Sequence, residues 1–196
     1  MDRSADLVVL VSGSGTNLQA LIDATESGDL DAKICLVVSN RTDVFALKRA
    51  ADASIETAVL EKGNLERAEY DAKLSELVAS VDPDLVVLAG WNRILSSVFL
   101  SSQLVINLHP ALPNTFAGLG CIEKAFEAWG ANEIEHSGVM IHWVPDEGVD
   151  TGPVITTKNV PFESGDSLEL FTQRMHEAEH IALVEGVSLA LGELGV

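Results

Sequence analysis

The chain has 196 residues, 47% of them hydrophobic and 5% aromatic, so it can bury one sizeable, mainly aliphatic core. Thirty acids against twelve Lys and Arg give a net charge of −18, which opposes binding to nucleic acid or anionic lipid. The two cysteines show no metal-ligand spacing, and the first apolar run (7–11) is too short for a signal peptide or a membrane span. We therefore expect a cytoplasmic protein with small-molecule ligands and no nucleic-acid or membrane partner.

The first hundred residues alternate short apolar runs with helical patterns, which predicts crossover connections and a parallel sheet. Strands are expected at 7–11, 34–38, 57–60 and 85–88, with helices near 16–27, 44–51 and 65–81 between them. Thr16 is expected to cap the first helix in a capping box with Gln19, and Gly28 lies where that helix should end.

The second half predicts a buried strand at 104–108, an irregular segment to 118, a helix at 122–129, and strands at 139–144 and 154–160. Asp166 and Glu169 are expected to form a capping box for a long last helix. Neither an internal repeat nor a low-complexity linker interrupts the chain. We therefore expect residues 1–196 to form a single α/β domain with a mostly parallel, doubly wound (Rossmann-like) sheet and helices on both faces.

A glycine-containing segment, Ser-Gly-Ser-Gly-Thr-Asn at 12–17, stands between the first strand and the first helix. The free N–H groups and dipole of a helix N-terminus favour anions, and glycine lets an oxyanion approach the backbone. Asn17 breaks the dinucleotide fingerprint, and no Walker lysine follows. The segment indicates a phosphate site, and a merely tight turn is the alternative.

Asn107 and His109 end a central strand, where ligands bind in open α/β sheets. Because they are two apart, both side chains point to the same face. An amide donor can stabilise an oxyanion, and an imidazole can polarise a carbonyl or relay a proton, as acyl transfer needs. A strand end whose histidine only binds backbone is the alternative.

Asp150 lies in a turn-rich loop and is followed by Thr-Gly-Pro, whereas Asp146 and Glu147 are expected to be solvated turn residues. A carboxylate held near His109 would orient the imidazole and raise its pKa. The sequence alone gives no proof of that pairing.

His176 and His180 share a helix face in the sequence His-Glu-Ala-Glu-His, which matches a zinc-protease pattern. A catalytic zinc needs a third protein ligand, and no suitable motif follows this helix. We therefore expect no metal.

Six segments together resemble the phosphoribosylglycinamide formyltransferase family, in order and at the expected separations, from about residue 7 to 185. They are SGSGTNLQALIDA, VVSNRTDVFAL, DLVVLAGWNRILS, INLHPALP, GVMIHWVPDEGVDTGPVI and HEAEH. The resemblance implies the formyltransferase fold and transfer of a formyl group from 10-formyltetrahydrofolate, as co-substrate, to the amine of glycinamide ribonucleotide in purine biosynthesis. A phosphate-binding half would span about 1–100, and a catalytic and folate half about 101–196; a homodimer is left open.

The resemblance also implies roles for individual residues. The catalytic residues would be Asn107, His109 and Asp150; the substrate phosphate would bind at Gly15, Thr16 and Asn17, and its ribose at His176 and Glu179. The folate would bind at Arg67, Asn92, Arg93, Ile94, Leu95 and Asn107. A surface charge on a helix is the alternative for Arg67.

The chain departs from the commonest family pattern at Gly120, where many members have a histidine, and at Asn92, which replaces an apolar residue. Rival functions are formyl transfer to methionyl-tRNA or a nucleotide sugar, hydrolysis that releases formate from the folate, and a non-catalytic nucleotide-binding module. The first three enzymes usually carry an extra domain, and the charge of −18 argues against tRNA. A binding module would not need Asn107, His109 and Asp150 to converge.

Overall fold

The computed structural model describes residues 4–196. In chain order the elements are β1 (Ala5–Val11), α1 (Thr16–Ser27), β2 (Ala32–Ser39), α2 (Phe45–Asp52), β3 (Thr57–Val59), α3 (Arg67–Ala79), β4 (Leu85–Leu88), α4 (Ser97–Leu100), β5 (Val105–His109), α5 (Cys121–Gly130), β6 (His136–Trp143), β7 (Val154–Pro161) and α6 (Leu168–Leu194). Every predicted strand and helix is present. The four-residue helix α4 was not predicted, because one turn is too short to show a periodicity.

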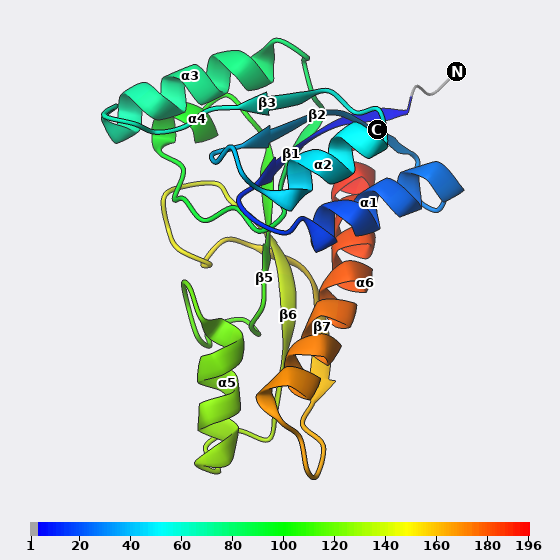
Figure 1. Cartoon of the computed structure of the whole chain (residues 1–196), viewed down its shortest axis with the longest axis vertical. Helices are drawn as coiled ribbons and strands as arrows, with labels where there is room; N and C mark the ends of the chain where they lie inside the picture. The colour runs from blue at the N-terminus through cyan, green and yellow to red at the C-terminus, as the bar shows by residue number, and fades with distance from the viewer. Residues whose placement is uncertain (1–3) are drawn as a thin grey trace.

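The strands form one seven-stranded sheet in the order β3-β2-β1-β4-β5-β6-β7. The first five strands in this order, β3, β2, β1, β4 and β5, are parallel to one another, whereas β6 pairs antiparallel with β5 and with β7. Figure 1 shows the parallel part packed with α1 to α4 in a wide body, from which β6, β7, α5 and the lower half of α6 extend. The predicted mostly parallel, doubly wound sheet is confirmed.

Two apolar cores lie on opposite faces of the sheet. One contains side chains of α1, α2, α5 and α6, and the other contains side chains of α3 and α4. The long helix α6 comes so close to β6 that a Cβ on Gly186 would lie 2.7 Å from side-chain atoms of Ile141. Because that helix spans both parts of the molecule, it ties the extension to the body (Figure 1). Within residues 4–196, the helices are all too short or too polar to cross a membrane.

Two predicted helix caps are wrong by one residue. Gly15, with φ of 73°, is the N-cap of α1, and Thr16 is the first residue of the helix. No side chain caps this helix by a hydrogen bond. The N-cap of α6 is Ser167, whose hydroxyl accepts from the Leu170 N–H. Asp166 instead accepts from the Glu163 N–H and pairs with Arg174, so its carboxylate is already committed outside the helix.

Candidate active site

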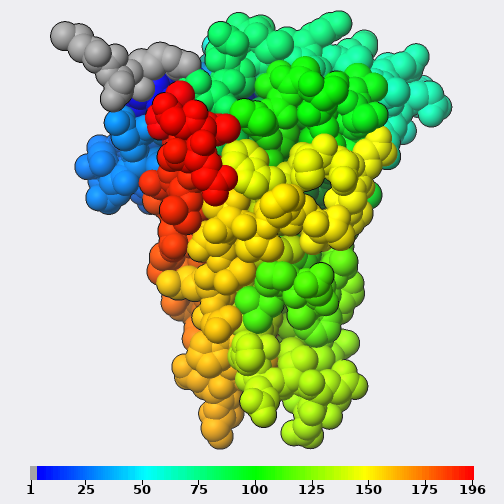
Figure 2. Space-filling view, turned by 180° about the vertical axis from the view of Figure 1, so that it is seen from behind, coloured from blue at the N-terminus to red at the C-terminus, as the bar shows by residue number. Residues whose placement is uncertain are grey.

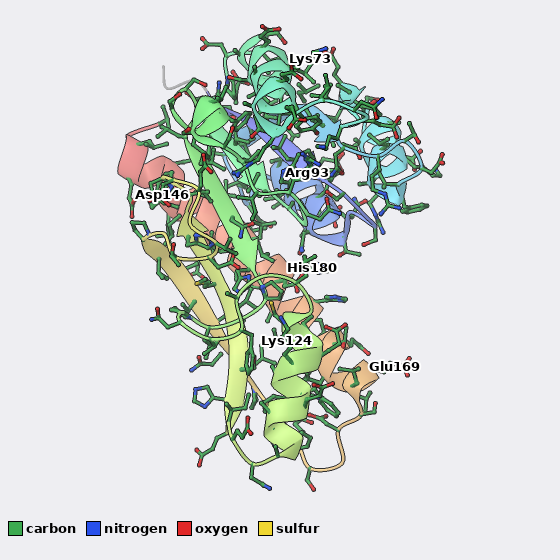
Figure 3. The ribbon with its side chains drawn as sticks, turned by 90° about the vertical axis from the view of Figure 1, so that its left-hand side faces the viewer. Lys73, Arg93, Lys124, Asp146, Glu169 and His180 are labelled. Carbon is green, nitrogen blue, oxygen red and sulfur yellow. The ribbon has the colours of Figure 1, made fainter. Side chains whose placement is uncertain are left out.

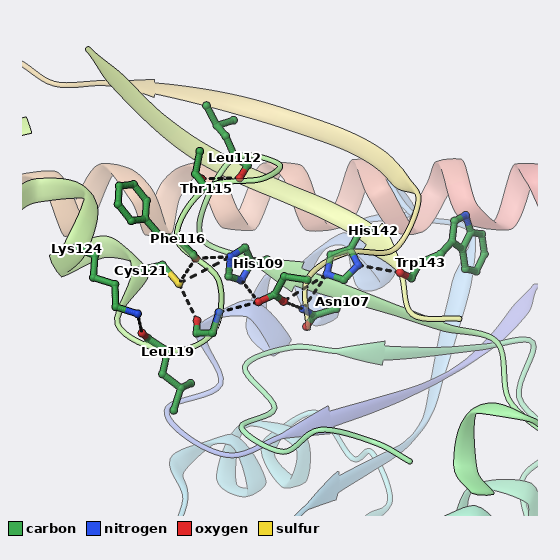
Figure 4. A network of polar contacts seen from close by, with 12 residues as sticks. Asn107, His109, Leu112, Thr115, Phe116, Leu119, Cys121, Lys124, His142 and Trp143 are labelled. Atoms are coloured by element: carbon green, nitrogen blue, oxygen red, sulfur yellow. Dashed lines mark hydrogen bonds and ion pairs between the residues drawn. The ribbon is translucent and has the colours of Figure 1, made fainter. Parts of the chain in front are cut away.

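The fold brings Asn107, His109 and Asp150 together at the carboxyl end of β5. Asn107 and His109 leave the strand on one face, and Asp150 reaches them from the loop between β6 and β7. Asp150 Oδ2 lies 3.3 Å from His109 Nδ1, and Oδ1 lies 3.3 Å from Asn107 Nδ2 (Figure 4). The convergence expected from the sequence is therefore observed, over sequence separations that no local rule connects.

The backbone around Asp150 is held in an unusual conformation. Its φ of 55° lies in the left-handed region, which aspartate tolerates better than most residues. The Gly118 N–H donates to Oδ2 over 2.9 Å, so a loop on the other side of the site also holds the carboxylate. Such strain is kept where surrounding contacts fix it, and here it aims the carboxylate at the amide and the imidazole.

The pKa of His109 is lowered overall, although the Asp150 carboxylate raises it as expected from the sequence. Burial of the imidazole, 3% exposed, disfavours its charged form, and this outweighs the raising effect of the Asp150 charge and of the Phe116 carbonyl. Burial alone would raise the pKa of Asp150, but the contact with His142, the hydrogen bond from the Gly118 N–H and the charge of His109 hold it below its usual value. The resting pair is therefore a carboxylate beside a neutral imidazole.

Both ring nitrogens of His109 nevertheless face acceptors. Nε2 donates to the Phe116 carbonyl over 2.9 Å, and Nδ1 faces the Asp150 carboxylate. An imidazolium would donate to both. The site is thus arranged to take up a proton when negative charge develops beside the ring.

Cys121 completes the surroundings of His109, and sequence reasoning had read it only as a residue without metal spacing. Its Sγ lies 2.7 Å from the Gly118 carbonyl, 3.1 Å from the Phe116 carbonyl and 3.8 Å from His109 Nε2 (Figure 4). Burial raises the pKa of this thiol, which favours the protonated form that can donate.

His142 was also missed. This buried imidazole, 1% exposed, stands directly across the antiparallel β5–β6 pair from Asn107. Its Nδ1 donates to the Trp143 carbonyl over 2.8 Å, which leaves Nε2 to accept from Asn107 Nδ2 over 3.1 Å. Nε2 also lies 3.7 Å from Asp150 Oδ1, so His142 contacts the carboxylate. A histidine in an apolar strand was the available signal.

The residues expected at the substrate phosphate and ribose lie together, although they are about 160 positions apart. Asn17 Nδ2 donates to Glu179 Oε2 over 2.8 Å, in a buried contact between α1 and α6. Burial raises the pKa of Glu179, while the hydrogen bond from Asn17 and the charge of His176 oppose that rise. The Asn17 Oδ1 atom is buried without a hydrogen-bond partner among residues 4–196, so it remains available to a donor.

Arg49 contributes a positive charge to the same loop and was not predicted. Its Nε donates to the Ser14 carbonyl over 3.0 Å, and its Nη1 donates to the Gln19 side chain over 3.1 Å. In a chain with a net charge of −18, a cation beside a helix N-terminus favours an anionic ligand there.

His180, on α6 (Figure 3), lines a surface hollow with Ala20 and Asp23 of α1. Burial, with further contributions that include the charges of His176 and Arg49, lowers its pKa. Across residues 4–196, no group of three or more His, Cys, Asp or Glu is placed to hold a metal ion.

The segment expected at the folate follows β4 and lies beside the phosphate loop. The Asn92 N–H donates to Ser12 Oγ, and the Asn40 amide donates to Asn92 Oδ1. Arg93 stacks over the Tyr70 ring at 4.3 Å, Leu95 is buried, and Ile94 is 51% exposed. Of the side chains expected in the pocket, Asn92 and Ile94 are therefore exposed to solvent.

The Arg67 side chain makes hydrogen bonds and an ion pair with other residues of the chain. Its guanidinium donates to the carbonyls of Ile94 and Leu95, and Nη1 lies 3.1 Å from Glu147 Oε2. Glu147 also accepts from the Ser97 N–H over 2.9 Å, which with the nearby Arg67 lowers its pKa. Glu147 is an exposed loop residue, as expected, but its side chain also joins the Asp150 loop to the start of α4.

A Rossmann-like sheet with an amide, an imidazole and a carboxylate at its carboxyl edge has the groups that an enzyme transferring acyl groups needs. The model of the family described as "Formyl transferase" matches residues 5–187. The chain is 45% identical to a phosphoribosylglycinamide formyltransferase of Schizosaccharomyces pombe, covering 93% of this chain and 95% of that protein. It is 44% identical to the Dictyostelium discoideum protein of the same name, over 94% and 97%.

A glycinamide ribonucleotide transformylase structure from Symbiobacterium toebii superposes with a TM-score of 0.91 at 32% identity, covering 98% of this chain and 90% of that one. The chain belongs to the formyl transferase family.

Proposed function

We propose that this enzyme transfers the formyl group of 10-formyltetrahydrofolate to the amine of glycinamide ribonucleotide, in de novo purine biosynthesis. The single observation that carries the proposal is the Asp150 carboxylate, which contacts both Asn107 and His109 at the carboxyl edge of the sheet. The names of relatives that align over nearly their whole length also support the proposal. The folate is a co-substrate, and the proposal involves no metal.

The chemistry follows from the geometry of these side chains. The substrate amine attacks the formyl carbon, a carbon–nitrogen bond forms, and the carbonyl electrons move to oxygen. Asn107 and His109 donate hydrogen bonds to that oxyanion. For Asn107 the oxyanion replaces Asp150, which now accepts over 3.3 Å, and for His109 it replaces the Phe116 carbonyl, which now accepts over 2.9 Å. Developing negative charge favours protonation of the resting neutral imidazole.

Collapse of the intermediate breaks the bond from the formyl carbon to the folate nitrogen. One proton leaves the attacking nitrogen, and one proton must reach the folate nitrogen. Asp150, ionised and 3.3 Å from His109, stabilises the imidazolium during this relay and can accept the first proton through water.

The substrate's phosphate would bind to the backbone N–H groups of Gly15, Thr16 and Asn17 at the start of α1. Glu179, with His176 one turn earlier, would contact the ribose. The contact between Asn17 and Glu179 supports this assignment, because one nucleotide must reach both groups.

The folate would bind along Asn92, Arg93, Ile94 and Leu95, with Arg67 facing its anionic tail and Asn107 near the formyl group. Arg67 would have to exchange Glu147 for that tail. The phosphate-binding half would then span about 1–100 and the catalytic half about 101–196, although this part of the folate site lies before residue 101. We further propose a cytoplasmic enzyme without nucleic-acid or membrane partners; a homodimer fits the proposal equally well.

The test measures folate absorbance with and without glycinamide ribonucleotide, in the absence of ATP and added metal. We expect acceptor-dependent turnover, and His109→Ala should lower it by about 10²–10⁴. His136→Ala is the matched control, because this exposed histidine lies at the other end of β6. Formate release without acceptor would identify a hydrolase, and no turnover on either would identify a binding module. Near-normal turnover of His109→Ala would remove that residue from the mechanism.

A further inference from the structure

A buried carboxylate lies outside the catalytic cluster, on α3. Asp71 is 1% exposed, and it is followed by Leu74 and Val78 on a helix that packs into an apolar core. Burying a carboxylate is costly unless hydrogen bonds replace its water. Packing alone would favour an apolar residue at this position, so the carboxylate of Asp71 indicates a specific hydrogen-bond partner.

That partner is the backbone at the end of the expected folate segment. The Ser96 N–H donates to Asp71 Oδ2 over 2.7 Å, in a buried contact that joins positions 25 apart. The other oxygen, Oδ1, has no hydrogen-bond partner among residues 4–196. The carboxylate is thus directed at one N–H group, at the point where the segment turns into α4.

Helix α3 holds the same segment at two further points. Arg67, one turn earlier on the helix, donates to the carbonyls of Ile94 and Leu95, and the Tyr70 ring lies beneath the Arg93 guanidinium. Arg67 is half-buried and paired with the exposed Glu147, so solvent and ligand can compete for it. Asp71 differs, because its hydrogen bond with the Ser96 N–H is buried and shielded from water, so solvent does not compete for it.

We propose that Asp71 is a positioning residue for the folate site: its buried carboxylate fixes the backbone of residues 92–96 in the conformation that receives the co-substrate. This inference rests on the proposed function and deepens it. Asp71 touches neither the reacting atoms nor the Asn107–His109–Asp150 cluster, so its loss should weaken folate binding and leave the chemical step intact.

The experiment compares Asp71→Ala, Asp71→Asn and Leu74→Ala. Asp71→Ala leaves the Ser96 N–H without its acceptor, whereas Asp71→Asn keeps an acceptor oxygen in the same place. Leu74→Ala is the matched control, because Leu74 is fully buried one turn further along α3 and makes no bond to the segment. Each variant is tested as the whole chain, below its melting temperature.

We expect Asp71→Ala to raise the KM and the calorimetric Kd for the formylfolate about tenfold. The KM for glycinamide ribonucleotide and kcat should stay within about twofold. Asp71→Asn should restore most of the folate affinity. Hydrogen exchange at the Ser96 amide should accelerate in Asp71→Ala but not in Leu74→Ala.

Equal effects of Asp71→Ala and Leu74→Ala on folate affinity would show that Asp71 only stabilises the fold, and would overturn the proposal. An unchanged folate Kd in Asp71→Ala would overturn it as well. Failure of the proposed function gives a different result, namely wild-type protein without turnover. The calorimetric and exchange measurements still test Asp71 in that case, because neither requires catalysis.

Discussion

At the scale of single residues, the protonation of His109 depends on two neighbours with opposite effects. Burial lowers its pKa most, the Asp150 charge raises it, and a charge on His142, once that ring is protonated, would lower it. We expect Asp150→Asn to lower the pKa of His109 further below its ordinary value and to reduce kcat by about 10²–10⁴. His142→Gln should instead raise the pKa. Titration of the imidazole C–H signals by NMR measures both shifts.

The linkage to stability has a definite sign. Both His109 and Asp150 have a pKa below the value expected in the unfolded chain. Their contribution to stability is present above the unfolded pKa and is lost as the pH falls through the folded one. Unfolding of the Asp150→Asn variant should therefore depend less on pH below about 4 than that of the wild type. If Asp150→Asn and His142→Gln shifted the pKa of His109 in the same direction, the opposite effects assigned to these two neighbours would be contradicted.

Sequence reasoning reached these residues unevenly. Asn107 and His109 could be placed on one face, because strand periodicity is a local rule. The approach of Asp150 followed only from the family resemblance, since a loop conformation with φ of 55° has no sequence signature. His142, Cys121 and Glu147 were missed because their roles depend on strand register and on loop contacts, which exist only in the folded chain.

At the scale of elements, the α1 N-terminus depends on how closely α2 packs against the loop before it. A Cβ on Gly15 would lie 2.6 Å from Ala46 Cβ and 2.7 Å from Ala46 Cα, and the residue has a φ of 73°. Gly15→Ala should destabilise the protein by about 1–3 kcal/mol, because it combines a strained backbone with a clash against another helix. Urea unfolding measures this loss.

Gly13 provides the matched control on the same loop. A Cβ there would meet nothing within 4 Å. Gly13→Ala should therefore leave the free energy of unfolding within about 0.5 kcal/mol of wild type. Equal stabilities of the two variants would mean that α2 can move away from the loop at little cost.

The elements themselves were the most predictable level of the structure. Doubly buried parallel strands appear in the sequence as continuous aliphatic runs, and helices alternate with them. Helix caps were less predictable, because Thr16 and Asp166 are good capping residues but the N-caps are the neighbouring Gly15 and Ser167. Asp166 was displaced by its pairing with Arg174, a tertiary contact that capping rules do not include.

At the scale of the whole molecule, charge is the dominant unusual property. The net charge of −18 is spread over an accessible surface of 9684 Å², seen from behind in Figure 2. Self-repulsion of this size destabilises a compact chain, and salt screens it. Exposed ion pairs such as Lys48–Asp52 and Arg67–Glu147 are also weakened by salt, but exposed pairs contribute little to stability. Repulsion should therefore decide the direction of the salt effect.

We expect the melting temperature to rise between about 0.01 M and 1 M sodium chloride, as the Debye length falls from about 30 Å to about 3 Å. A variant with Glu26→Gln, Glu56→Gln and Glu61→Gln, all exposed, removes three negative charges and serves as the control. It should melt higher in dilute buffer and respond less to salt, because less repulsion remains to be screened. Calorimetric scans of both proteins over the salt series measure this difference. A melting temperature independent of salt would refute the role of repulsion.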